Sequence, residues 1–109
     1  MGGAFDFFIG GFMSESTTAK SRFSLGRMVM TRGVASLFTG REHDLLSLLR
    51  RHARCDWGGL CDEDKASNDF ALLSGGRLLS CYQVTPDQQV FIITERDRSY
   101  TTILLPSEY

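Results

Sequence analysis

The side chains of this sequence that could do chemistry together are a histidine and a group of polar residues near the end of the chain. Cleavage of RNA without a metal ion needs a base and an acid that move protons, and arginines that neutralise the phosphate. The residues that could supply these parts are His52, Glu95, Arg98 and Thr101 or Thr102, with Arg50 and Arg54 near the phosphates. A nucleolytic site is possible if the fold brings these residues to one open cleft.

His52 also has a structural interpretation. Leu45, Leu48, Leu49 and His52 follow one another at helical spacing, which places all four on one stripe of a helix. An apolar stripe faces the core of a small protein, so we expect His52 to be a hydrogen-bonded core residue. The pattern therefore favours a structural role over a catalytic one.

The polar segment 94–99, TERDRS, lies between two apolar runs and is typical of a charged β-turn. In such a turn Asp97 and Ser99 hydrogen-bond the local backbone, and Glu95 and Arg98 are close enough in sequence to pair with each other. These side chains would then be satisfied without a substrate. We therefore expect the purified protein not to cleave RNA.

Three cysteines raise the question of a metal site. Cys55 and Cys61 form the pattern H-x2-C-x5-C with His52, and Cys81 is a distant third thiol. Structural zinc sites favour cysteines two to four residues apart, so this spacing does not predict one. An odd number of cysteines without a secretory signal indicates reduced, buried thiols in the cytoplasm. We predict no metal and no cofactor.

Trp57, in the segment Asp56-Trp57-Gly58-Gly59, is either an exposed recognition anchor or a core residue where two helices meet. Large aromatic side chains between helices are usually core. We therefore predict a buried Trp57, with Asp56 capping the residues that follow it.

Composition and charge limit the partners. The chain has 109 residues, a formal net charge of −1 and a pI of about 6.1. This charge does not attract nucleic acid or an anionic membrane, and no basic stripe or helix-turn-helix pattern is present. Nucleic-acid binding is possible but not favoured, and a membrane partner is not expected. The partner class that remains is another protein, with the oligomeric state left open.

The first thirteen residues, MGGAFDFFIGGFM, are apolar but too few to span a bilayer, and they lack a basic start. The composition changes at Met13, which we expect to be the natural start, with residues 1–12 dispensable for stability. Residues 1–21 are predicted to be a disordered extension and polar tail. Residues 22–109 are predicted to be a single domain.

The expected fold class is α+β: a short N-terminal strand, two main helices, and a three-stranded antiparallel sheet packed against the helices. The expected elements are a strand at 22–31 broken by Gly33, a helical turn at 34–38, helices at 41–54 and 60–73, and strands at 77–84, 90–94 and 101–105. Thr39 is the expected N-cap of the first long helix. The expected core is one cluster of Leu45, Leu49, Phe70, Leu79, Phe91, Ile93 and Leu104.

Four stretches carry a resemblance to a known family: RFSLGRMVMT, HARCDWGGLCDEDKASND, GGRLLSCYQV and VFIITERDRSYTTILLPSEY. Their most specific pieces are DWG, S-x-Y, ITE-x-DRS and TTILLP. In residues 22–109 the sequence resembles short uncharacterised bacterial proteins carried on plasmids and integrative elements, which are usually described as plasmid-related. It departs from them at Thr31-Arg32-Gly33, where the relatives have Thr-Pro-Gly. Some are described as type I restriction or methylation subunits, but this chain lacks the Gly-rich loop and the length of a methyltransferase domain.

The resemblance implies an accessory or interaction protein of a bacterial mobile element. The alternative is a metal-independent ribonuclease or toxin-like domain with the layout of barnase or RelE, in which a helical histidine precedes an antiparallel sheet that carries Arg, Glu and Thr. These hypotheses differ in one observable feature. The enzyme requires His52 and Glu95 to lie within hydrogen-bond reach of a common open cleft.

Overall fold

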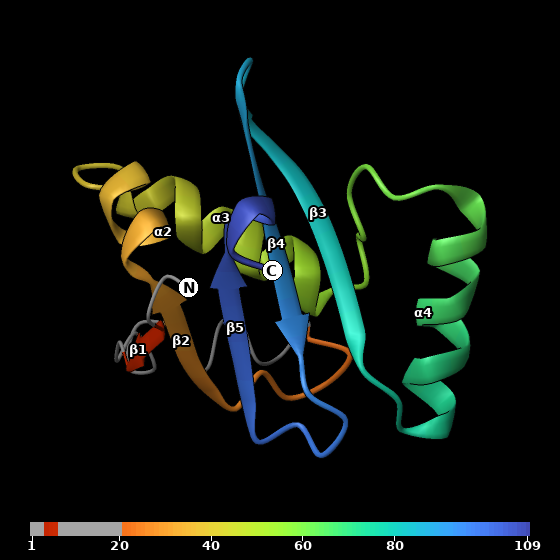
Figure 1. Cartoon of the computed structure of the whole chain (residues 1–109). Coiled ribbons are helices and arrows are strands. Elements are labelled where there is room, and N and C mark those ends of the chain that lie inside the picture. Colours follow the sequence, from red (N-terminus) through yellow and green to blue (C-terminus); the bar gives the residue numbers. More distant parts are fainter. Residues whose placement is uncertain (1–3, 7–20) are drawn as a thin grey trace.

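The computed structural model describes residues 4–6 and 21–109, which form one mixed sheet with helices on one face and along one edge (Figure 1). The elements in chain order are β1 (Ala4–Asp6), β2 (Arg27–Thr31), α2 (Arg32–Leu37), α3 (Glu42–Ala53), α4 (Asp62–Ser74), β3 (Leu78–Thr85), β4 (Gln88–Thr94), β5 (Tyr100–Leu104) and a final 3₁₀ turn, η1 (Pro106–Glu108). Among these described helices, none combines the length and the apolar character needed to cross a membrane.

The sheet has the strand order β1-β2-β5-β4-β3. The antiparallel set β3-β4-β5 confirms the α+β class and the three C-terminal strands. The predicted sheet had three strands and did not include the short N-terminal strand, but β2 joins the same sheet, parallel to β5, and makes the sheet mixed. β1 pairs antiparallel with β2, so residues 4–6 of the predicted extension form a strand. The boundary between tail and domain otherwise remains a prediction.

The N-terminal strand is shorter than predicted because its first residues do not pair with a neighbouring strand. The Arg22 N–H donates to the Ala53 carbonyl at the end of α3, at 2.8 Å. The Leu25 carbonyl accepts a hydrogen bond from the Thr101 hydroxyl. Residues 21–26 therefore cross from α3 to the sheet, and regular pairing begins only at Arg27.

The core lies between one face of the sheet and the helices α2 and α3, which cover that face in Figure 1. The residues that β3, β4 and β5 direct toward α3 include Tyr82, Val90, Ile92 and Ile103. Our predicted cluster is therefore wrong in part. Leu45 and Leu49 belong to this core, but Leu79, Phe91, Ile93 and Leu104 lie on the opposite face of the sheet, and Phe70 is exposed.

Helix capping also differs from the prediction. Thr39 does not cap α3, because its hydroxyl donates to the Ala35 carbonyl. The side-chain cap is at α2, where Thr31 Oγ1 accepts the Val34 N–H at 3.2 Å and donates to the Glu108 carboxylate at 2.6 Å. Gly33 was expected to end the N-terminal strand, but β2 ends at Thr31 and Gly33 lies within α2. An added Cβ at Gly33 would stand 2.6 Å from Glu108 Oε2. The C-terminal turn is therefore held against the start of α2.

Candidate functional site

His52 lies in the middle of a chain of hydrogen bonds that crosses the core. Its Nδ1 is 2.5 Å from Ser80 Oγ on β3, and its Nε2 is 2.9 Å from Thr94 Oγ1 on β4. Thr94 Oγ1 is 2.7 Å from Thr101 Oγ1 on β5, which donates to the Leu25 carbonyl at 2.7 Å. The four side chains are fully buried. This buried chain joins α3, three strands and the segment that precedes β2.

The carbonyl group at one end of this chain of hydrogen bonds determines which atom donates in each of them. A carbonyl oxygen can only accept, so the Thr101 hydroxyl uses its proton on Leu25 and must accept from Thr94. Thr94 has then used its proton and accepts the Nε2–H of His52, which leaves Nδ1 to accept from the Ser80 hydroxyl. His52 is therefore the neutral Nε2–H tautomer, and each proton of the chain has one acceptor.

Burial keeps His52 neutral. Loss of solvent, together with the nearby positive charge of Arg98, lowers the pKa of His52 to about 3. The rings of Phe23 and Trp57 lie 5.3 Å and 5.8 Å from the imidazole ring, centroid to centroid. Both nitrogens are engaged and no solvent reaches the ring, so His52 in this structure cannot exchange a proton with a substrate.

Glu95 and Arg98 do not pair as expected. The Glu95 carboxylate lies 3.6 Å from the Arg77 guanidinium. The Arg98 guanidinium donates instead to backbone carbonyls, at 2.6 Å to Gly76, 3.0 Å to Glu95 and 3.4 Å to Ala71. Arg98 reaches the Gly76 and Ala71 carbonyls because the end of α4 lies beside the β4–β5 turn. Arg98 therefore connects the β4–β5 turn to the end of α4.

In the same turn Asp97 bonds the local backbone, as predicted, whereas the Ser99 hydroxyl bonds the Asp97 side chain and not the backbone. Asp97 Oδ1 accepts both the backbone N–H and the hydroxyl of Ser99, at 2.9 Å and 2.6 Å. These bonds lower the pKa of Asp97 below its usual range.

The candidate catalytic residues do not meet at an open cleft. His52 and Thr101 are fully buried, Thr102 is half-buried on the opposite face of the sheet, and Glu95 lies at the end of β4 beside Arg77. Arg50 on α3 is half-buried, and Arg54 is exposed at the end of that helix. The ribonuclease hypothesis requires His52 and Glu95 to lie within hydrogen-bond reach of a common open cleft, and in this structure they do not.

The cysteines are less uniform than expected. Cys81 is buried and Cys55 half-buried, but Cys61 is exposed at the N-cap of α4. Burial raises the pKa of the Cys81 and Cys55 thiols. Over residues 4–6 and 21–109, no three His, Cys, Asp or Glu side chains stand together in a way that could hold a metal ion.

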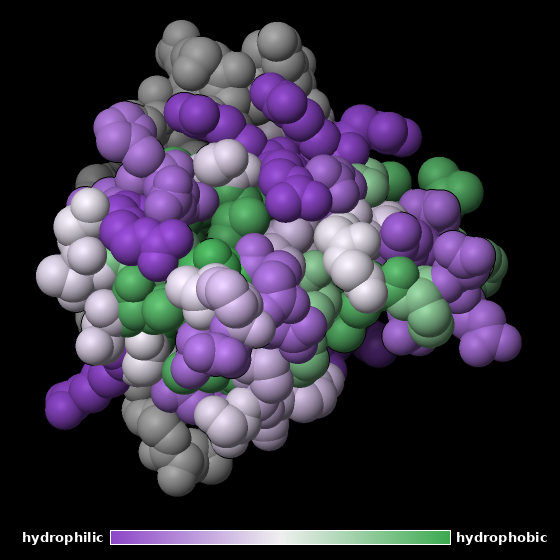
Figure 2. Space-filling view, turned by 90° about the horizontal axis from the view of Figure 1, so that it is seen from above, coloured by the Kyte–Doolittle hydropathy of each residue, from purple (hydrophilic) through white to green (hydrophobic). Residues whose placement is uncertain are grey.

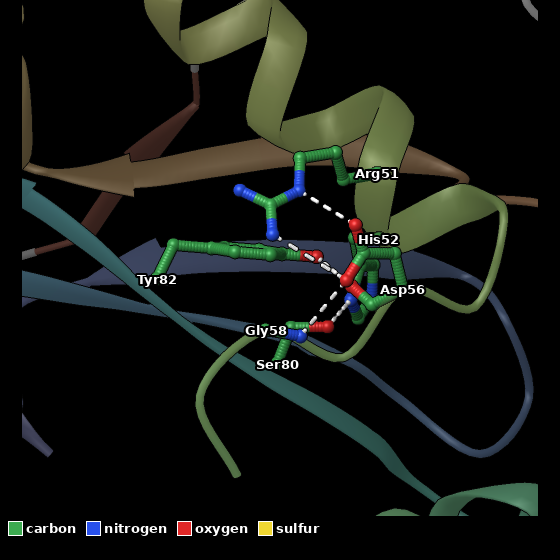
Figure 3. A network of polar contacts seen from close by, with 6 residues as sticks. All are labelled: Arg51, His52, Asp56, Gly58, Ser80 and Tyr82. Atoms are coloured by element: carbon green, nitrogen blue, oxygen red, sulfur yellow. Dashed lines mark hydrogen bonds and ion pairs between the residues drawn. The ribbon is translucent and has the colours of Figure 1, made fainter.

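The DWGG segment runs along the outer edge of β3 and is held there by a polar cluster (Figure 3). The Arg51 guanidinium lies 4.6 Å from the Tyr82 ring and bonds the Asp56 carboxylate at 2.7 Å. That carboxylate also accepts the Gly58 N–H, as the capping prediction expected. At Gly58 the backbone has φ +75°, and an added Cβ would stand 2.0 Å from the Cys81 carbonyl oxygen. Only glycine allows this close approach.

Trp57 is buried, as predicted, with 4% of its surface exposed. Its carbonyl accepts the Cys81 N–H, and the Gly59 N–H donates to the Cys81 carbonyl. The indole N–H donates to the Asp69 carboxylate on α4 at 3.0 Å. Trp57 therefore connects the β3 edge with α4 as well as with the core.

The helix α4 stands beside β3 and not over a face of the sheet (Figure 1). The Asn68 side chain accepts the Leu79 N–H at 3.1 Å and donates to the Leu79 carbonyl at 2.6 Å, as a neighbouring strand would. With Trp57 to Asp69 and Arg98 to the end of the helix, this contact forms a polar seam between α4 and the rest of the domain. No role was predicted for Asn68, although its spacing from Lys65 and Leu72 places the three residues on one side of the helix.

The apolar residues of α4 point the other way. Phe70 was predicted to belong to the core, but it is 70% exposed, and on the same side of the helix Leu73 is 88% exposed and Ala66 is exposed too. We call these three residues the outer face of α4. In the view from above, apolar atoms appear among polar ones along the flank where α4 lies (Figure 2). The side of α4 on which Phe70 lies is therefore presented to solvent.

Searches of protein-family models, curated proteins and solved structures with this chain found no match.

Proposed function

We propose that this chain is a small accessory protein of a bacterial mobile element that binds another protein through the outer face of α4. The mobile-element context is drawn only from the resemblance of the segments DWG, ITE-x-DRS and TTILLP to plasmid-related proteins. The interaction site is drawn from one observation. Phe70 and Leu73, both large and apolar, are 70% and 88% exposed on a single helix.

The way in which α4 is attached supports this role. A surface helix normally buries its apolar stripe against its own domain. The polar seam holds α4 instead, through Asn68, Asp69 and the carbonyls that Arg98 bonds. Burial of a Phe or Leu side chain contributes about 1.5–3 kcal/mol. Because Phe70 and Leu73 are exposed, they contribute little of this free energy to folding. Their burial would instead stabilise a complex with a partner that covered them.

The ribonuclease alternative has less support. Its base, His52, has no solvent access and both of its ring nitrogens are occupied. We expect the protein not to cleave total RNA in the absence of metal. Cleavage by the wild type that disappears in both His52→Ala and Glu95→Ala would make the enzyme the leading hypothesis.

A photo-crosslinking amino acid tests the proposed site in cells that carry the gene. We expect p-benzoylphenylalanine at position 73 of the full chain to give a discrete crosslinked product. The matched control carries it at Gln89, an exposed residue of β4 remote from α4. Phe70→Ser should remove the product from the position 73 sample. The same products at both positions, or none at position 73, would contradict the proposal.

A further inference from the structure

We infer that the segment which covers the outer face of α4 is a basic amphipathic helix of the partner protein. This inference depends on the proposed function, and it adds the chemistry of the partner. The observation that carries it is the charge that surrounds the exposed apolar residues.

The helix α4 is acidic, and three of its four carboxylates, Asp62, Glu63 and Asp69, lie on or beside the outer face. The helix contains Asp62, Glu63, Asp64 and Asp69 against one basic residue, Lys65, which gives four negative charges and one positive charge. The whole chain has a net charge of only −1, so the negative charge is concentrated on this helix.

The positions of these charges matter more than their number. At about 100° per residue, Asp62 falls on nearly the same line as Leu73, and Glu63 on nearly the same line as Phe70. On the same count Lys65 lies about 80° from Leu73 and about 140° from Phe70, to one side of the outer face, and it is half-buried. The outer face therefore combines exposed apolar side chains with carboxylates and with no basic residue of α4. A partner of complementary charge would present Lys or Arg beside its apolar side chains.

The spacing of the apolar residues favours a helix as the partner segment. Ala66, Phe70 and Leu73 follow at i, i+4 and i+7, which makes one ridge with a small residue at one end. An extended peptide would instead need unpaired backbone groups at a strand edge. At β3 those groups of Leu79 and Cys81 are already bonded, to Asn68 and to the DWGG segment.

A second copy of this chain and an anionic membrane fit less well. Contact between two parallel α4 helices would bring Asp62 and Glu63 of one copy close to the same residues of the other, and like charges repel. In an antiparallel pair, the outer face of neither copy would supply a basic residue to neutralise these acids. Three apolar residues per copy are also few for a stable interface, which buries about 1,200–2,000 Å². The acids on and beside the outer face would oppose an anionic lipid surface.

Synthetic peptides test the inference with the full-length protein. The probes are labelled helices of about 18 residues: one with a leucine stripe flanked by lysines, one with glutamates in place of the lysines, and a scrambled leucine–lysine peptide without a stripe. We expect the first to bind at least about tenfold more tightly than the other two in fluorescence anisotropy. Its affinity should fall as salt rises, because the attraction is electrostatic.

The variants assign the binding to the outer face. Phe70→Ser with Leu73→Ser should weaken the leucine–lysine peptide by about tenfold or more. Asp62→Asn with Glu63→Gln should weaken it several-fold. Tyr109→Ser is the matched control, because Tyr109 is also exposed but lies at the C-terminus. All altered residues are exposed, so far-UV circular dichroism and the melting temperature should not change.

Each outcome decides between the alternatives. Equal binding of the glutamate peptide that depends on Phe70 and Leu73 would overturn the basic partner but leave the docking face intact. Peptide binding that is unchanged by the Phe70 and Leu73 substitutions would overturn the inference, and so would the absence of any binding. The crosslinking experiment alone would then test the proposed function. Self-association in sedimentation that those substitutions abolish would identify a second copy as the occupant.

Discussion

The helices α3 and α4 contact the same sheet in opposite ways. α3 directs Leu45, Leu46 and Leu49 into the core, and its one buried polar side chain, His52, belongs to a fully paired chain of hydrogen bonds. α4 has one fully buried residue, Asn68, and two of its large apolar side chains, Phe70 and Leu73, are exposed. A face of a sheet offers side chains, whereas an edge offers unpaired peptide groups. The element that covers an edge must therefore present polar groups to it.

The largest expected effect separates two leucines on these helices. Leu49 is fully buried and Leu73 is 88% exposed. Leu49→Ala should lower the free energy of unfolding by about 2–5 kcal/mol because it leaves a cavity. Leu73→Ala should change it by no more than about 0.5 kcal/mol. Urea denaturation measures both, and similar losses at the two sites would mean that α4 is packed against the fold as α3 is.

The pH dependence of stability tests the neutral state of His52. Its pKa is about 3 in the folded protein and about 6.5 when unfolded, so below pH 6.5 the unfolded chain binds a proton that the folded protein does not. His52 therefore contributes its full stability above pH 6.5 and loses it as the pH falls toward 3, by up to about 1.4 kcal/mol per pH unit. His52→Leu should flatten this slope between about pH 6.5 and 4.5, as measured by urea denaturation at each pH. A slope unchanged by the substitution would show that His52 titrates normally.

The direction of the buried chain predicts the effect of Thr94→Val. Valine has the shape of threonine but cannot accept the His52 Nε2–H, which would then be a buried donor without a partner. Such a group costs about 1–3 kcal/mol of stability. Thr102→Val is the control, because Thr102 is half-buried on the opposite face and should lose much less. Equal losses at the two threonines would contradict the assigned direction.

The last comparison concerns the polar seam, where water can replace part of what is lost. Asn68→Ala removes both hydrogen bonds to Leu79, at a cost of about 0.5–1.5 kcal/mol each if water does not replace them. The sharper measurement is hydrogen exchange of the Leu79 amide, which should lose protection while the Ile92 amide on the inner strand β4 keeps it. A Leu79 amide that stays protected in Asn68→Ala would show that another group covers this edge.

The prediction of elements from sequence was more successful than the prediction of faces. The bounds of α3, α4 and the three C-terminal strands agree with the expected ranges within a few residues. The stretch Val90–Thr94 is apolar at nearly every position, so alternation could not show that Val90 and Ile92 face α3 while Phe91 and Ile93 face away. In α4, Phe70 was assigned to the core because the rule for amphipathic helices assumes that the apolar side of a helix packs against the rest of the domain.

The sequence by itself determined the local structure: the helices, the turns at Gly75 and Pro86, and the buried Trp57. These features depend on residues close in the chain and on the general cost of exposing an indole ring. Only the tertiary structure decided that β2 lies parallel to β5 and that Asn68 holds α4 against the edge of the sheet. It also decided that the chain of hydrogen bonds through His52 ends at the Leu25 carbonyl, which Thr101 bonds. The physical reason is that a hydrogen-bonding group must be satisfied wherever it is buried, but its partner can lie anywhere along the chain.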